Sequence, residues 1–427
     1  MEKTDIRYQT YVQILKNELV PAMGCTEPIS LAYAASVARA TLNQLPDRIE
    51  VYASGSIIKN VKSVVVPNTN GLKGISAAVA AGTYAGDASK ELEAIASVSE
   101  DQKAGIQEYL NTTPISVHYL KSDHVFHLMV DSYFEEHCVR VEIVDTHRNI
   151  VLIRKDDEII MQKEITEEKA TPVEAVDYSL LNMQDIFDFV QTMDVTDVQE
   201  TLDRQIEYNM AIAQAGLEQD WGANIGSTLL AAYGDDVRVR AKANAAAASD
   251  ARMNGCELPV IINSGSGNQG ITCSVPVITY ARELNCSHEK TLRALALSNL
   301  TTIHQKTRIG TLSAFCGVVS AGAAAGAGIS YLLTEDYNHC VHTVVNSLAI
   351  VSGMICDGAK PSCAAKIAES IDSALLAHAM YENGQQFYGG DGIVFKGIEN
   401  TLDSVGFLGK EGMRETNEKI IQLMVKN

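Results

Sequence analysis

The sequence predicts an α+β protein, with an N-terminal α+β domain at residues 1–172 and an all-helical domain of Ala/Gly-rich buried helices at residues 173–427. Three observations lead to this prediction. Short β-type runs occur between residues 49 and 153. Beyond about residue 176 the β signal is faint and helical spacing prevails. A stretch without charges, rich in alanine and glycine, lies between Arg308 and Glu335 and indicates a helix inside a core.

The first forty residues predict two helices. Apolar residues at helical spacing from Tyr8 to Leu19 predict the first. Residues 21–24 interrupt it, and residues 26–28 are typical of the start of a second helix that runs to Leu42. We expect these two helices to pack on the helical domain.

From residue 48 onward the pattern changes to strands. The β-type runs are Ile49–Val51, Val64–Val66, Ser116–Leu120, Val125–Tyr133, Cys138–Val144 and Ile150–Ile153. Helical material lies between Lys73 and Tyr109. The charged segment 164–171, followed by Pro172, is the predicted linker.

The rest of the chain predicts helices joined by turns that contain Gly, Asn or Pro. The helical segments are Leu229–Ala232, Val237–Ala251, Pro276–Glu283, Leu292–Leu300, Ala314–Leu333, Val341–Ile355 and Ala364–Met380.

The charge-free stretch is longer than the ~20 residues that cross a bilayer. Its sequence from Ala321 to Ser330, AGAAAGAGIS, is only weakly hydrophobic, whereas membrane helices carry many large apolar residues. Small residues also let helices approach closely in a soluble core. We therefore expect a buried helix and no membrane partner.

Composition narrows the class of protein. The chain has 34 Lys and Arg against 53 Asp and Glu, a net charge of −19, which argues against a nucleic-acid partner. Nine cysteines in 427 residues are too few for a disulfide scaffold, and the N-terminus lacks a secretory signal. We expect a cytoplasmic protein.

Cysteines lie in three loops that contain Gly or Pro, where a backbone can wrap around a metal. These loops are residues 23–28, 313–317 and 356–363. Their spacing fits neither a zinc CxxC pair nor a ferredoxin run, so spacing alone favours buried structural thiols over metal ligands. The other five cysteines are interpreted as ordinary thiols: Cys138, Cys256, Cys273, Cys286 and Cys340.

Polar loops form further candidate sites. Residues 263–270 (NSGSGNQG) can expose backbone N–H groups to an anion, or can simply cap a helix. Residues 54–60 and 67–71 form a similar cluster in which Lys59 is a candidate carboxylate partner. The basic segment 304–310 (HQKTRIG) offers a base or an anion ligand, or is only a solvated helix end.

Taken together, these segments resemble the iron-sulfur-dependent amino-acid lyases over nearly the whole chain. The similarity is to the alpha chain of bacterial L-serine dehydratase and, more closely, to the L-cysteine desulfidase family with its YhaM-like members. The motifs that carry the resemblance are PAMGCTEP (21–28), SGSIIKN (54–60), VPNT (66–69), GSGNQGI (265–271), HQKTRIGTLSAFCG (304–317) and CDGAKPSC (356–363).

The resemblance implies a 4Fe-4S cluster that does no redox chemistry. Cys316, Cys356 and Cys363 would hold it and leave one iron open as a Lewis acid. Cys25 would be either a fourth ligand or the base that takes the Cα proton, and its place before a helix start favours the base. Glu27 would hold the substrate ammonium or orient Cys25.

The implied reaction is β-elimination of L-cysteine to sulfide, pyruvate and ammonia. The implied catalytic residues are Cys25, Glu27, His304 and Lys306, and the implied substrate-binding residues are Ser54, Ser56, Lys59, Asn60, Asn68, Thr69, Ser264, Ser266, Asn268, Gln269 and Arg308. An L-serine dehydratase with the same cluster is one alternative. A non-catalytic amino-acid-binding relative without a cluster is another. The expected partner is a small amino acid, and the protein could be a homodimer.

Overall fold

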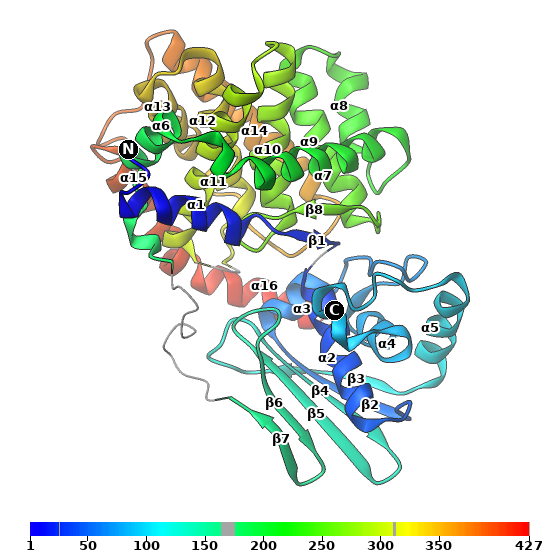
Figure 1. The fold of residues 1–427 in the computed structure, drawn as a ribbon. Coiled ribbons are helices and arrows are strands. Elements are labelled where there is room, and N and C mark those ends of the chain that lie inside the picture. Colours follow the sequence, from blue (N-terminus) through cyan, green and yellow to red (C-terminus); the bar gives the residue numbers. More distant parts are fainter. Residues whose placement is uncertain (25, 164–175, 311–312, 427) are drawn as a thin grey trace.

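The computed structural model describes residues 1–24, 26–163, 176–310 and 313–426. It has one part built on a β-sheet and a larger helical part, which Figure 1 shows one above the other. The predicted α+β class is confirmed, with the sheet in the N-terminal half and helices in the C-terminal part. The predicted linker, residues 164–171 with Pro172, lies outside the described residues, so the boundary at residue 172 stays a prediction.

Within the described residues, six strands form one sheet in the order β3-β2-β4-β5-β6-β7, with β2 and β3 parallel and the other neighbours antiparallel. The strands are β2 (Arg48–Ser54), β3 (Ile115–Leu120), β4 (His127–Phe134), β5 (His137–Val144), β6 (Ile150–Lys155) and β7 (Glu158–Gln162). Alternate residues point into a core, so that Val51, Val130 and Val141 are neighbours across three strands.

Helices cover that apolar face. They are α2 (Thr26–Leu42), α3 (Gly55–Val61), α4 (Gly74–Ala85) and α5 (Glu100–Thr112), with the short 3₁₀ helix η1 (Ala88–Glu93). Helix α2 packs against α4 and against β4 and β5. The expected strand at Val64–Val66 was wrong, because it forms only an isolated bridge between Val65 and Lys73. Strand β7 was missed because it is mostly exposed and lacks apolar alternation.

The helical part surrounds a central helix, α12 (Gly317–Thr334), which packs against α10, α11, α13 and α14. Its glycines allow this closeness, since a Cβ on Gly322 would stand 2.8 Å from the backbone oxygen of Ser370. The other elements of this part are α1 (Ile6–Glu18), η2 (Tyr178–Leu180), α6 (Met183–Thr192), η3 (Val195–Asp197), α7 (Gln199–Glu218), α8 (Ile225–Tyr233), α9 (Val237–Met253), α10 (Gly267–Glu283), α11 (His288–Ile309), α13 (Tyr337–Val351), α14 (Cys363–Glu382), α15 (Ile398–Phe407), η4 (Leu408–Gly412) and α16 (Arg414–Lys426).

Helix α12 is also the one helix in the described residues that is long and apolar enough to span a bilayer. Its mean hydropathy is 1.4, and 83% of it is buried inside the protein. This burial is typical of a core helix, as its alanine and glycine content predicts.

The chain crosses between the two parts near both ends. Helix α1 lies in the helical core, as expected, and β1 (Pro21–Met23) pairs with β8 (Pro259–Ile261). The expectation for the second helix was wrong, since α2 belongs to the core of the sheet part. At the other end, α16 packs against α3 (Figure 1), where Ile421 touches Gly55. Both termini therefore hold the two parts together.

One buried acid in the helical part makes stability depend on pH. Asp250 on α9 has no exposed surface. Its Oδ2 accepts the backbone N–H of Gly226 at 3.0 Å, and its Oδ1 has no hydrogen-bond partner among the described residues. Burial raises the pKa of Asp250 from 3.8 to about 6. Between these values the folded protein keeps a proton that the unfolded chain has lost, so this group lowers stability as the pH rises.

Asp250→Asn is expected to raise the free energy of unfolding above that of wild type by up to about 3 kcal/mol above pH 6. This difference between the two proteins should disappear towards pH 4. Urea unfolding at pH 4.5, 5.5 and 7.0 measures it. Asp235→Asn, at an exposed aspartate, is the control and should change little. A variant that is less stable than wild type at pH 7 would show that the carboxylate is needed in its charged form.

Candidate active site

Three of the predicted site cysteines converge in the helical part. The segments 314–316 and 354–356 run antiparallel: the Cys316 N–H donates to the Met354 carbonyl at 3.1 Å, and the Cys356 N–H donates to the Ala314 carbonyl at 2.6 Å. The loop after Cys356 returns at Cys363, the first residue of α14. Cys316 itself caps the start of α12. Two helix N-termini therefore point their partial positive charge at this group.

Cys316 is buried, Cys356 and Cys363 are partly buried, and the three thiols are close enough to influence one another. Burial is the main cause that raises the pKa of Cys316 to about 12, and the neighbouring Cys356 and Cys363 contribute to this rise. Burial likewise raises the pKa of Cys363. Thiols must lose their protons to bind a metal, so a ligand that binds here has to compensate for the buried negative charge.

The donor chemistry of this group fits an iron-sulfur cluster. In the ranges described, no three His, Cys, Asp or Glu side chains are spaced as ligands of one ion. Thiolate is the usual ligand of iron-sulfur clusters. Because each thiolate binds a different iron of the cluster, the sulfurs lie farther apart than the ligands of a single metal ion. Cys316, Cys356 and Cys363 thus offer the kind of ligand that an iron-sulfur cluster takes.

The basic segment 304–310 is divided between two faces of α11. Lys306 faces the thiols. It is 9% exposed, and its Nζ donates to the Gly310 carbonyl at 2.9 Å. Burial lowers its pKa to about 8, although the nearby Cys356 and Cys316 act in the opposite direction. His304 faces α15 instead, where its Nε2 lies 2.9 Å from a carboxylate oxygen of Glu399. Arg308 pairs with Glu399 at 2.6 Å and with Asp403 at 2.5 Å. Of the three, the structure brings only Lys306 to the cysteines.

The sheet part contributes a wall opposite the cysteine loop. Lys59 on α3 is 1% exposed and its Nζ donates to the Asn417 side chain on α16 at 2.7 Å. Burial lowers the pKa of Lys59, while the nearby Cys356, Asp357 and Glu27 act in the opposite direction. The loop presses on this helix, since a Cβ on Gly358, at φ +93°, would stand 2.0 Å from the Lys59 carbonyl oxygen.

Two more predicted residues join this wall. The Asn60 side-chain N–H donates to Glu27 at 2.9 Å, and both residues are buried. Because Glu27 also acts on Lys59, these three side chains form one polar group beside the thiols.

The polar loop 263–270 reaches the site from the helical part. The Gln269 amide packs against Gly317, the residue after Cys316, and its Oε1 is buried with no hydrogen-bond partner in the part of the chain that the structure describes. The Asn268 oxygen accepts from Arg252 at 3.1 Å. The loop is anchored from behind, since the Asn263 amide donates to Asn299 on α11 at 2.9 Å.

Other predicted site residues use their polar atoms to hold loops together. The Ser54 hydroxyl donates to the Val125 carbonyl at 2.8 Å, the Asn68 amide to the Ile95 carbonyl at 2.8 Å, and the Thr69 hydroxyl to the Val66 carbonyl at 2.7 Å. The Ser264 hydroxyl donates to Asn263 at 2.9 Å.

Three predicted residues remain. Ser56 is buried on α3 beside Lys59, and Ser266 caps α10. Cys25 lies outside the described residues.

Two residues at the site were missed by the sequence analysis. Arg252 is a buried arginine at the end of α9, and its signal was an isolated cation after a run of alanines. Asn417 carries no local signal, because it reaches Lys59 only through the return of α16.

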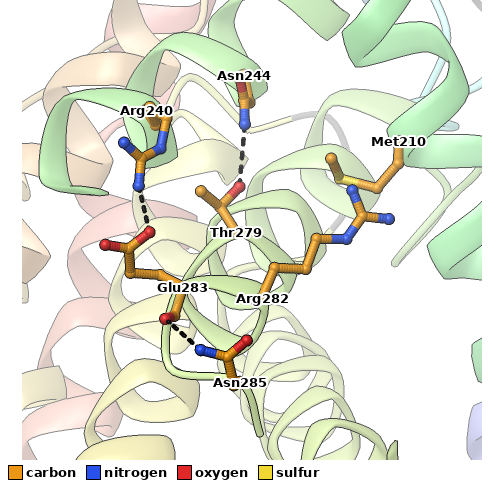
Figure 2. A pocket seen from close by; sticks show the side chains of 7 residues that line it. All are labelled: Met210, Arg240, Asn244, Thr279, Arg282, Glu283 and Asn285. Atoms are coloured by element: carbon orange, nitrogen blue, oxygen red, sulfur yellow. Dashed lines mark hydrogen bonds and ion pairs between the residues drawn. The ribbon is translucent and has the colours of Figure 1, made fainter. Parts of the chain in front are cut away.

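A separate hollow lies away from the cysteines. Figure 2 shows it, a space of about 570 Å³ at the C-terminal end of α10, with the Arg240–Glu283 ion pair and the Asn244–Thr279 hydrogen bond in its lining. The loop next to the thiols is at the other end of α10, about 24 Å away at 1.5 Å per residue. The hollow is therefore not part of the thiol site.

The fold and the thiol site agree with a known class of enzymes. Residues 89–422 match the model of the serine dehydratase alpha chain family, and the chain belongs to this family. The family indicates a lyase of serine dehydratase type, and such proteins are generally associated with iron-sulfur clusters. The broader resemblance drawn from the sequence is thereby confirmed, while its closer part, to L-cysteine desulfidase, stays a prediction.

Particular relatives cover the whole chain. It is 54% identical over 425 residues to a UPF0597 protein of Desulfitobacterium hafniense (strain Y51), covering 100% of this chain and 98% of the relative. It is 50% identical to a UPF0597 protein of Lachnoclostridium phytofermentans, covering 98% of this chain and 100% of the relative. A UPF0597 protein of Treponema denticola is 46% identical, with 99% of each covered. These names state no substrate.

Proposed function

We propose that this protein is an iron-sulfur-dependent amino-acid lyase that converts L-cysteine to sulfide, pyruvate and ammonia. The observation that carries the proposal is the convergence of Cys316, Cys356 and Cys363, with the buried amines of Lys59 and Lys306 beside them. Such a group suits a cofactor and a substrate that both bring negative charge. A cytoplasmic location, where thiols stay reduced, is part of the proposal.

Cys316, Cys356 and Cys363 would hold the cluster, which when bound supplies a Lewis acid for the leaving group or the carboxylate. The chain's own residues do the rest. Lys306 stabilises the negative charge that develops on the leaving sulfur. Glu27, held by Asn60, binds the substrate ammonium. Cys25, which lies outside the described residues, is proposed as the base for the Cα proton.

The products follow from the bonds that break. The base takes the Cα proton, the electrons of that bond form the Cα–Cβ double bond, and the sulfur leaves with the electrons of the Cβ–S bond. The resulting enamine becomes an imine and is hydrolysed by water to pyruvate and ammonia. Pyridoxal phosphate has no role in this sequence.

L-Serine is the second candidate substrate, and the family match to the serine dehydratase alpha chain favours it. In that case the same residues act and the leaving group is hydroxide. L-Cysteine is the first choice because the motifs PAMGCTEP (21–28) and CDGAKPSC (356–363) are more similar to the L-cysteine desulfidase family.

The test is anaerobic reconstitution with iron and sulfide, removal of excess reagent, and assays with both amino acids. We expect sulfide and pyruvate from L-cysteine, with kcat/KM at least 10-fold above that for L-serine, the size of a modest difference in transition-state binding. Pyruvate from L-serine alone would establish the second candidate. Reconstituted protein that turns over neither amino acid would contradict both.

A further inference from the structure

A buried arginine beside the thiol site forms no ion pair with the residues that the structure describes. Arg252, in the last turn of α9, is 3% exposed. Its guanidinium joins two distant segments: one nitrogen donates to the Gly24 carbonyl at 2.6 Å and another to the Asn268 side-chain oxygen at 3.1 Å. The Nε–H is buried and has no acceptor among the described residues.

Both oxygens that Arg252 contacts are neutral. Its neighbour Asp250 turns its carboxylate to the backbone N–H of Gly226 instead. A guanidinium keeps its charge in any protein environment, and burying an ion without an opposite charge costs several kcal/mol. A buried guanidinium that contacts only neutral oxygens is suited to bind the anionic group of a ligand.

The position of Arg252 connects it to the thiols. Asn268, which it holds, is followed by Gln269, and the Gln269 amide packs on Gly317 next to Cys316. Both amides belong to the first turn of α10, whose free N–H groups favour an anion at the same place. The rigid fork of N–H donors in arginine matches the two oxygens of a carboxylate.

The other cations near the site are already engaged. Arg308, the arginine that the sequence favoured, pairs with Glu399 and Asp403. Lys59 donates to Asn417, and Lys306 donates to the Gly310 carbonyl. Among these cations, only Arg252 has a buried nitrogen that makes no hydrogen bond within the described residues.

We propose that Arg252 binds the α-carboxylate of the amino-acid substrate, with Asn268 orienting the guanidinium. The proposal rests on the proposed function, because it takes the ligand to be an α-amino acid. On this proposal the site selects its ligands first by their free carboxylate and only then by their side chain.

The test compares ligands that differ only at the carboxylate. Binding of α-methyl-L-cysteine and α-methyl-L-serine, which lack the Cα proton and so are not turned over, is compared with binding of their amides by calorimetry on the anaerobically reconstituted protein. Wild type should prefer the acid over the amide by about 100-fold, the loss usual when a buried charge pair is broken. Arg252→Gln should reduce this preference to less than about 5-fold while leaving amide binding nearly unchanged.

Arg293→Gln is the matched control. Arg293, near the far end of α11, also donates to backbone carbonyls, those of Val190 and Met193, but it has an ion pair with Glu289. It should keep the full preference. Arg252→Lys retains the positive charge but loses the planar set of N–H donors, and it should keep a preference for the acid of about 10-fold. If Arg252→Gln does not fold, this variant tests whether Arg252 binds the carboxylate.

Two results would overturn the proposal: no preference for the acid in wild type, or equal weakening of acid and amide by the Arg252 variants. A different result would contradict the proposed lyase function. A carboxylate preference that depends on Arg252, in protein that releases neither sulfide nor pyruvate, leaves the role of Arg252 standing and contradicts the reaction.

Discussion

Replacing Cys316, Cys356 or Cys363 by serine is expected to abolish the visible absorption of the anaerobically reconstituted protein. Lyase turnover should fall by at least about 1000-fold, because loss of a Lewis acid removes several kcal/mol of transition-state stabilisation. The three thiols come together through the antiparallel segments 314–316 and 354–356 and the start of α14. Removing one should therefore affect the whole group.

Cys138→Ser and Cys286→Ser are the controls for this prediction. Cys138 lies in β5 of the sheet, and Cys286 lies in the turn between α10 and α11; both are partly buried and outside the thiol group. These variants should bind iron and sulfide as wild type does. Wild-type iron and sulfide content in two of the three ligand variants would show that these thiols do not hold the cluster.

Lys306→Met is expected to lower kcat by about 100-fold or more while leaving the iron and sulfide content unchanged. The Lys306 amine is the one cation of α11 that faces Cys316 and Cys356, and it carries no carboxylate partner among the ion pairs of the described residues. Methionine fills the same space without the charge. Iron and sulfide analysis with steady-state kinetics measures the effect.

Stability separates this role from a structural one. Burial lowers the pKa of Lys306 to about 8, so below pH 8 the folded protein carries a buried charge that costs free energy. Lys306→Met should therefore be at least as stable as wild type at pH 7. Lys290→Met, at the other end of α11 where Lys290 pairs with Glu335, is the control and should keep kcat. Full activity in Lys306→Met would remove this residue from the proposed chemistry.

Much of the fold could be predicted because its elements carry local patterns. The alternation in β5 and the alanine and glycine content of α12 indicate a half-buried strand and a packed helix. Helix α7 could not be predicted in the same way, since its sequence is largely polar and its buried face includes Gln205 and Asn209. These amides find partners only in other elements, Gln205 in Asn299 and Asn209 in Ser274.

The site, too, has residues that local sequence patterns indicate and residues that only the fold brings together. Residues grouped in one loop, such as Cys356 and Cys363, could be selected from the sequence. The direction of His304 could not, because its partner Glu399 is 95 positions away. Arg252 contacts Gly24 across 228 positions, and its one local signal, a cation after a run of buried alanines, does not show which segments it joins.

The contact between Lys59 and Asn417 also sets the order in which the site can be built. These residues are 358 positions apart, and Asn417 belongs to the last helix of the chain. A chain made from its N-terminus folds its earlier parts first. The wall beside the cysteine loop therefore stays open while residues 60–413 are being synthesised, and it closes only when α16 has been made.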